Sequence, residues 1–201
     1  MIVFFLSHTL FVSLHAINKR RMREGYTIRQ YCMERGTLVG ITTSMSFLAS
    51  MYGLNNIPVG HISNLLALLA WAIAIFSIRR WRLQVEPSLT FGHTWRMVLG
   101  IYFYAILLTA AVQYTYFAFL DHGRLAMQME QLLAIPEYHQ MLEQMFDSED
   151  TQTIVQQVLT VFRIPAKATM QMLWMNTLLA FILTIPTTLL GLIGKKTMHN
   201  K

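Results

Sequence analysis

Residues 97–120, MVLGIYFYAILLTAAVQYTYFAFL, decide the fold of this chain. The stretch contains no charged residue. At about 1.5 Å per residue, a helix of this length extends about 36 Å, enough to cross a hydrocarbon core of about 30 Å. Tyr102 and Tyr104 near one end, and Tyr114 and Tyr116 near the other, are typical of the aromatic belts at the two membrane surfaces. The stretch therefore predicts a membrane-spanning helix.

The composition of the whole chain indicates the same class of protein. Hydrophobic residues make up 54 % and charged residues 13 % of the 201 residues, whereas soluble domains carry about 25 % charged residues. The net charge of +6 arises from basic residues beside apolar stretches, a pattern typical of topology determinants and headgroup contacts and not of a nucleic-acid-binding face. The single cysteine, Cys32, excludes an intramolecular disulfide and a cysteine-built metal site.

Three further apolar stretches accompany this one, so we predict an all-α polytopic membrane protein with four transmembrane helices. Pro186 is expected to kink the fourth helix. Residues 55–60, NNIPVG, have the composition of a tight turn between the first two. The predicted spans are residues 36–54, 62–78, 97–120 and 168–193.

The segment between the third and fourth spans differs in kind from the rest of the chain. Within residues 121–165, apolar residues recur at helical spacing among polar and acidic ones. This pattern is typical of short amphipathic helices that pack on one another and rest on the membrane. The spans and this segment together form a predicted membrane domain over residues 36–194, which a basic tail follows at residues 195–201.

Residues 1–35 are predicted to form a cytoplasmic leader, whose first 21 residues are ambiguous. An apolar run over residues 1–17 is followed by basic residues, which reverses the charge order of a signal peptide. Three interpretations of residues 1–21 stay open. They form a short apolar helix in the membrane, or a reverse-signal-like anchor, or they lie upstream of a true start at Met22.

The distribution of charge predicts which side of the membrane each segment faces. Of the 16 Lys and Arg residues, only Arg124, Arg163 and Lys167 fall between the third and fourth spans, while most of the carboxylates fall there. Because cytoplasmic loops carry the excess of Lys and Arg, both termini are predicted to be cytoplasmic and residues 121–165 to lie outside the cytoplasm.

Several local features accompany this layout. They are Leu89-Thr90-Phe91-Gly92-His93 before the third span, an aromatic exit over residues 116–121, a Ser-Glu-Asp start at residues 148–150, and lysines after the fourth span. Together they resemble the domain-of-unknown-function family 4199, over residues 29–196. The resemblance implies a small four-helix protein of the bacterial inner membrane and supplies no catalytic residues.

Small and polar residues within the spans are the candidates for packing or functional sites. Gly36, Gly40 and Ser44 recur at every fourth position, which places them on one helix face that another helix can approach closely. Packing within the chain is favoured over a dimer seam. Gln113 and Asn176 are candidates for a polar path, although amides in a bilayer usually join helices. The other side chains predicted to be buried are Thr42, Thr43, Ser46, Ser50, Asn64 and Gln171.

No motif in the sequence indicates catalysis. The histidines form no two-turn pair around a glutamate, and the serines and glycines form no nucleophile elbow or phosphate-binding loop. The four spans as predicted also hold no charge that would mark an ion path. We therefore expect a non-enzymatic protein without cofactor or metal.

Two functions are compatible with these features. The favoured one is an accessory or structural membrane protein that binds a lipid, itself or another membrane protein through its acidic outer segment. Methionine-rich amphipathic helices offer adaptable apolar surface, and the candidate contact residues are Met129, Met141, Met145 and Phe146. The alternative is a small transporter or channel that acts as an oligomer, with Thr42, Ser46, Gln113 and Asn176 along its pore.

Overall fold

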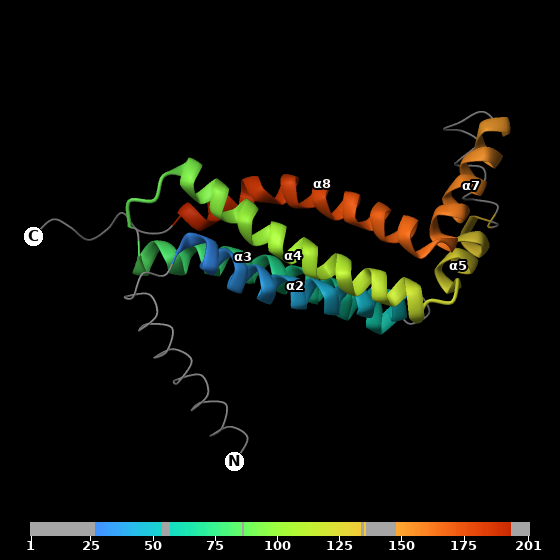
Figure 1. Ribbon diagram of the computed structural model, residues 1–201, viewed down its shortest axis with the longest axis horizontal. Helices are drawn as coiled ribbons and strands as arrows, with labels where there is room; N and C mark the ends of the chain where they lie inside the picture. Colours follow the sequence, from blue (N-terminus) through green and yellow to red (C-terminus); the bar gives the residue numbers. More distant parts are fainter. Residues whose placement is uncertain (1–26, 54–56, 86, 134, 136–147, 194–201) are drawn as a thin grey trace, which may run out of the picture.

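The computed structural model describes residues 27–53, 57–85, 87–133, 135 and 148–193, which contain six helices and no strand (Figure 1). The all-α prediction is therefore confirmed for these ranges. Several predictions lie outside the described residues: the interpretations of residues 1–21, the turn at residues 55 and 56, the contact residues Met141, Met145 and Phe146, and the tail at residues 195–201.

Four long helices lie side by side and form an elongated bundle (Figure 1). They are α2 (Ile28–Gly53), α3 (Ile57–Gln84), α4 (Phe91–Phe119) and α8 (Pro165–Leu192). Helices α2 and α4 run in one direction, and α3 and α8 run in the other. Two shorter helices, α5 (Arg124–Leu133) and α7 (Ser148–Arg163), lie at the end of the bundle where α4 ends and α8 begins. We call this the α5/α7 end, and the other the arginine end.

Three of these helices are long and apolar enough to cross a membrane: α3 from Pro58, α4 and α8. Their length and composition are those of a membrane protein. Helix α3 extends beyond its predicted span at both ends, whereas α4 and α8 begin before their predicted spans and end one residue short of them. Helix α3 begins at Ile57, so the predicted turn over residues 55–60 is wrong for residues 57–60. The reason is that Pro58 suits the first turn of a helix, where its missing N–H group needs no partner.

Side-chain hydrogen bonds that the sequence analysis did not predict fix the start of α2 and the end of α8. At the start of α2, Thr27 Oγ1 accepts a hydrogen bond from the Gln30 N–H (3.3 Å), and Gln30 Oε1 accepts one from the Thr27 N–H (3.1 Å). This reciprocal pair is a capping box. At the end of α8, Arg79 donates to the Leu190 carbonyl (3.1 Å) and Arg82 donates to the Leu192 carbonyl. The arginines thus satisfy carbonyl groups that have no partner within α8.

The close approach of α2 to α4 depends on the face that carries Gly36, Gly40 and Ser44. All three residues are buried. A Cβ atom on Gly36 would lie 2.6 Å from the Ile101 carbonyl oxygen, and one on Gly40 would lie 3.1 Å from Ala105 Cα. The partner of this face is therefore a helix of the same chain, and α4 occupies the surface that a dimer seam would need.

Two clusters of buried residues lie toward the two ends of the bundle. The larger one, toward the arginine end, contains Tyr31, Ile78, Trp81 and Met97 and extends along α4 to Ala105. The smaller one, toward the α5/α7 end, contains Phe47, Tyr116 and Phe117, and half-buried Phe162 from α7 packs on it. Between these clusters the four long helices enclose a cavity, which the next section describes.

Candidate functional site

The main candidate site is a cavity of about 390 Å³ within the bundle. This volume falls in the range of small-molecule pockets, about 300–1,000 Å³. All four long helices contribute to its wall, and most lining residues are apolar. The lining residues are Val39, Thr43, Ser46, Phe47, Ser50, Met51, Ala67, Ala70, Trp71, Tyr102, Ala105, Ile106, Thr109, Gln113, Met172, Asn176, Leu179, Ala180 and Leu183.

Hydrogen bonds join three helices at the end of the cavity nearer the arginine end. Trp71 Nε1 on α3 donates to Thr187 Oγ1 on α8 (2.9 Å), and the Tyr102 hydroxyl on α4 lies 2.7 Å from the same oxygen atom. The Thr187 hydroxyl in turn donates to the Leu183 carbonyl (2.6 Å). A polar network of this kind joins helices within a bilayer, so the polar groups at this end of the cavity have partners within the protein.

The hydroxyl groups along the cavity wall are also occupied. Thr43 Oγ1 and Thr109 Oγ1 lie 2.7 Å apart across α2 and α4, and Thr109 also donates to the Ala105 carbonyl. Ser46 on α2 donates to the Ser63 carbonyl on α3, and Ser63 donates to the Ser46 carbonyl, each over 2.9 Å. These hydroxyls already have partners within the protein.

Gln113 is the exception among the buried lining residues. Its side chain is 3 % exposed, and Oε1 has no hydrogen-bond partner in the described part of the protein. A buried acceptor without a partner costs about 1–3 kcal/mol. Most such groups in native structures are satisfied by the protein or by water. Oε1 itself is covered, but Gln113 lines the cavity, so a rotation of its terminal amide would present the unpaired acceptor to the hydrogen-bond donor of a bound molecule.

Asn176 lies at the same depth as Gln113 on the facing helix. Tyr102 and Thr187 are bonded across α4 and α8, and these two helices run in opposite directions. Gln113 follows Tyr102, and Asn176 precedes Thr187, by the same number of residues. At about 1.5 Å per residue, both amides lie about 16 Å from the bonded end. The cavity thus has a bonded end and presents two amide groups farther along its wall, and Met51 and Met172 line it beyond these amides.

The exposed lining residues lie on α3 and α8, which indicates that the cavity opens sideways between these two helices. Of the residues that line it, only Ala67 on α3 and Leu179 on α8 are exposed; the others are buried or half-buried. Leu179 is 54 % exposed. Because the outer surfaces of both helices are apolar, an opening at this position faces the hydrocarbon region of a surrounding bilayer.

The structure brings together some of the polar residues predicted from the sequence and separates others. Ser46, Gln113 and Asn176 line the cavity. Thr42 does not, and its hydroxyl donates to the Leu38 carbonyl within α2. Asn64 and Gln171 are exposed, so their predicted burial is wrong. They point away from the bundle because helical periodicity, which the prediction did not apply to them, places them on the outer faces of their helices.

The sequence analysis missed the bonded end of the cavity. Tyr102 was assigned to an aromatic belt, but its hydroxyl is buried and bonded to Thr187. The available signal was the position of Tyr102 on the same helix face as Ala105 and Thr109, at spacings of three and four residues. A tyrosine on that face points into the bundle and not toward the headgroups.

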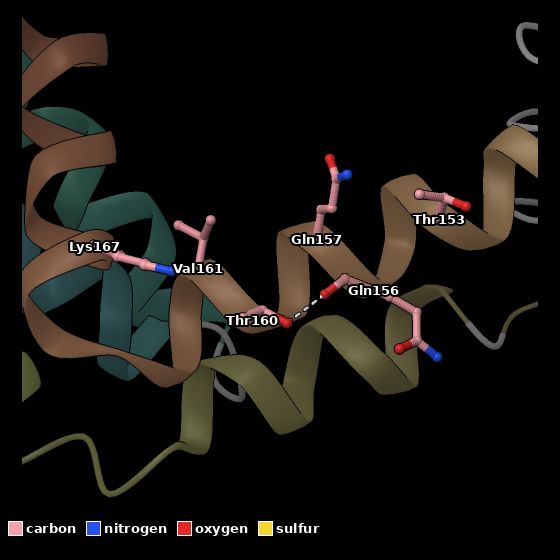
Figure 2. A pocket seen from close by; sticks show the side chains of 6 residues that line it. All are labelled: Thr153, Gln156, Gln157, Thr160, Val161 and Lys167. Atoms are coloured by element: carbon pink, nitrogen blue, oxygen red, sulfur yellow. Dashed lines mark hydrogen bonds between the residues drawn. The ribbon is translucent and has the colours of Figure 1, made fainter.

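A second hollow lies on the outside of α7 and has a different character. It is broad and shallow, about 660 Å³, and is lined by Thr153, Gln156, Gln157, Thr160, Val161 and Lys167. Figure 2 shows Gln156 on the side of α5 and Gln157 pointing away from it. The Thr160 hydroxyl donates to the Gln156 carbonyl (2.8 Å). Because these side chains are mostly exposed and hydrated, the hollow lacks a buried group that selects a ligand.

The α5/α7 end carries a single described ion pair and one predicted contact residue. Arg163 on α7 lies 3.7 Å from Glu130 on α5, with both side chains well exposed. Such a surface pair contributes at most about 1 kcal/mol. Met129 on α5 is half-buried. The buried Asp121 carboxylate accepts a hydrogen bond from the Leu125 N–H (3.2 Å) and caps the start of α5. Among the described residues, no group of His, Cys, Asp and Glu is placed to hold a metal ion.

Comparison with known proteins places the chain in a family. The model of a family described as "Protein of unknown function (DUF4199)" matches residues 34–191. This match confirms the resemblance stated from the sequence. It covers the four long helices except the first residues of α2 and the last residue of α8. No curated protein and no solved structure is detectably similar to the chain.

Proposed function

This chain belongs to the DUF4199 family, and we propose from the geometry of its cavity that it binds a small membrane-dissolved molecule between α2, α3, α4 and α8. The observation that carries the proposal is Gln113, an unpaired buried acceptor in the wall of an otherwise satisfied and largely apolar cavity. A buried polar group without a partner is costly, and a bound molecule that forms the missing hydrogen bond offsets this cost.

The proposal includes four membrane spans, with α2 as the fourth. Half of residues 36–53 are Gly, Ser or Thr, which lowers the apolar character of α2 below that of the other long helices. Yet every hydroxyl between Thr37 and Ser50 is bonded to a carbonyl of α2 or α3. Bonded hydroxyls remove the main cost of placing such a helix in lipid. The exposed residues of α2 include Leu38, Ile41 and Met45, which suit contact with acyl chains.

We further propose that the arginine end faces the cytoplasm of a bacterial cell, in the inner membrane. Arg79, Arg80, Arg82 and Arg96 lie at this end, where α3 ends and α4 begins. The α5/α7 end instead carries Asp121 and Glu130 with few basic residues. An excess of Lys and Arg on the cytoplasmic side is the general rule for membrane proteins, and it supports this orientation.

Binding fits the cavity better than catalysis does. No charged residue, histidine or cysteine is among the described residues that line it, so its wall offers no general acid or base of ordinary pKa near neutral pH. The bonded network of Trp71, Tyr102 and Thr187 joins three helices at one end of the cavity. This network favours a binding site that is open to the membrane. The transporter alternative would instead require a continuous pore in at least one of its states.

Photolabelling tests the proposed binding site. The purified protein in lipid nanodiscs is irradiated with an alkyl diazirine, and labelled residues are located by mass spectrometry. Val39 and Ala105 are buried but line the cavity, whereas Val98 and Ile101 are equally buried and do not line it. We expect adducts on the first pair and not on the second. Equal labelling of both pairs, or labelling of neither, would contradict the proposal.

A second candidate function is the binding of a partner protein or lipid through the outer segment. The exposed side chains of α7, together with Met127 (55 % exposed) on α5, support it. The test is the mass of the complex in mild detergent, compared between the wild-type protein and the variant Met127→Lys. A complex that keeps its mass and composition in the variant, and in a second variant Gln157→Lys, would count against this function.

A further inference from the structure

We propose that the cavity selects a neutral single-chain amphiphile, with its hydroxyl or amide head at Gln113 and Asn176 and its chain directed toward Trp71 and Tyr102. This inference rests on the proposed function and names the chemical class of the ligand. It follows from three properties of the cavity: where its unused polar groups lie, how wide it is, and which way it opens.

The head of the ligand is located by the unused hydrogen-bonding groups. Gln113 Oε1 accepts no hydrogen bond in the described structure, and the half-buried Asn176 amide lies at the same depth on the facing helix. The nearby hydroxyls of Ser46, Thr43 and Thr109 are already bonded. The ligand must therefore supply a donor to Gln113. An alcohol or a primary amide supplies a donor and can also accept from Asn176.

The charge of the ligand is limited by the wall. The described lining residues carry no charged side chain, so a carboxylate or an ammonium group would be desolvated without a counter-charge. Burying an unpaired ion costs far more than burying a hydrogen-bonded neutral group. The ligand that fits this wall is therefore neutral.

The shape of the cavity favours a single chain. Its volume of about 390 Å³ is distributed over at least about 16 Å, because the lining extends from the bonded end past the two amides to Met172. The mean cross-section is then at most about 24 Å², from this volume and this rise per residue, which accommodates one extended alkyl chain but not two side by side. The wall between the two ends is apolar and includes Ala70, Ile106 and Leu183.

The opening identifies where the ligand comes from. Ala67 and Leu179 form the exposed edge of the cavity between α3 and α8, and this edge faces lipid in a bilayer. A molecule with a long apolar chain concentrates in the bilayer by the hydrophobic effect. It can therefore enter sideways without passing through the bonded end at Trp71, Tyr102 and Thr187.

Competition between two matched probes tests the inference. Tritiated dodecan-1-ol is bound to the protein in nanodiscs, with empty nanodiscs as background, and is displaced by unlabelled dodecan-1-ol or by its methyl ether. The ether has the same chain and an acceptor oxygen but no donor. We expect the alcohol to compete about tenfold better than the ether, because the ether cannot donate one buried hydrogen bond and this loss corresponds to about tenfold in affinity. Equal competition by the two probes would overturn the inference.

Variants then locate the donor contact. Gln113→Leu is expected to weaken alcohol binding about tenfold and to remove the difference between the alcohol and the ether. Gln171→Leu makes the same substitution on an exposed position outside the cavity and should leave both affinities unchanged. A difference between alcohol and ether that persists in Gln113→Leu would place the donor contact elsewhere and overturn the assignment.

The two levels of the proposal fail in different ways. If the cavity binds an apolar molecule without selecting a donor, Val39 and Ala105 are photolabelled while the alcohol and the ether compete equally. In that case the proposed function stands and the ligand class is wrong. If the cavity binds no such molecule, neither probe binds saturably and the photolabelling of Val39 and Ala105 is absent, which contradicts both.

Discussion

Gly36 allows α2 to approach α4 closely, because a residue without a side chain leaves room for the α4 backbone. A Cβ atom at this position would lie 2.6 Å from the Ile101 carbonyl oxygen and 2.6 Å from Tyr104 Cβ. Neither neighbour can move without shifting α4, since one is backbone and the other is the first atom of a side chain. We therefore expect Gly36→Ala to destabilise the protein by about 1–3 kcal/mol, the usual cost of overpacking.

Gly92 provides the control for this substitution. It also lies in a helix, in the first turn of α4, but a Cβ atom there would meet nothing within 4 Å. Thermal unfolding of the two variants in the same detergent measures the contrast. Gly92→Ala should unfold at or slightly above the wild-type temperature, because alanine favours the helix over glycine. If both variants unfolded at the wild-type temperature, the close packing of α2 on α4 would be contradicted.

Cys32 gives a second prediction at this scale. Its side chain is 4 % exposed, and its Sγ atom donates a weak hydrogen bond to the Met97 carbonyl (3.5 Å) on α4. A thiol in this position reacts only when the helices open. We expect maleimide to modify Cys32 about a hundredfold more slowly than the cysteine of Cys32→Ser/Met33→Cys. Met33 is the neighbouring residue and is 48 % exposed, so equal rates would contradict the burial of Cys32.

At the scale of helices, the end of α8 depends on two arginines of α3. Arg79 and Arg82 donate to the carbonyls of Leu190 and Leu192, where the helix has no further N–H groups of its own. We expect Arg79→Gln/Arg82→Gln to increase amide hydrogen exchange over the last turn of α8 about tenfold, as the turn frays. Arg80 lies between them but donates to Gln84 within α3. Arg80→Gln should therefore leave exchange in α8 unchanged, and an equal increase in both variants would contradict this capping role.

Among the helices, the sequence predicted the position of α4 well and the length of α3 poorly. The apolar run over residues 97–120 predicted α4 because length and the absence of charge are sufficient criteria for a span. The same criteria underestimated α3. Helix α3 begins at Ile57, five residues before its predicted span, and extends through Arg82 to Gln84. These extensions depend on proline at a helix start and on long cationic side chains, which a count of apolar residues does not register.

The candidate site shows the same limit. Gln113 was identified because a buried amide in a span is unusual, and it lines the cavity. Trp71, Tyr102 and Thr187 were not identified as a group, because they come from three helices far apart in the sequence and meet only when α3, α4 and α8 pack together. Composition shows that a polar residue lies within a span, but helix packing determines which of these residues find partners.

At the scale of the whole molecule, the number of spans determines whether the start of α2 and the end of α3 face the same side of the membrane. Four spans place Arg29 and Val85 on the same side, whereas three spans, without α2, place them on opposite sides. In a Cys32→Ser background, we expect a membrane-impermeant maleimide to modify Gln157→Cys in intact cells, and Arg29→Cys and Val85→Cys only after permeabilisation. All three positions are exposed in the structure. Modification of Arg29→Cys in intact cells would contradict the fourth span.

The last prediction concerns the sideways opening of the cavity, because the arrangement of the four helices determines whether a molecule in the bilayer can enter there. Ala67 is exposed at the edge of the opening on α3 and is adjacent to Leu68, which is 59 % exposed but does not line the cavity. Phenylalanine at position 67 would fill the gap toward Leu179 without disturbing the buried core, whereas phenylalanine at position 68 would extend into lipid.

We therefore expect Ala67→Phe to reduce diazirine labelling of Val39 about fivefold or more, because the entry of a chain-sized probe needs a gap of its own width. Leu68→Phe should leave this labelling unchanged, and Phe181, which is 55 % exposed on α8, should be labelled to the same extent in both variants. If Ala67→Phe did not reduce the labelling of Val39, the probe would enter by another route. The gap between α3 and α8 would then be a packing irregularity of the bundle and not the entrance to its cavity.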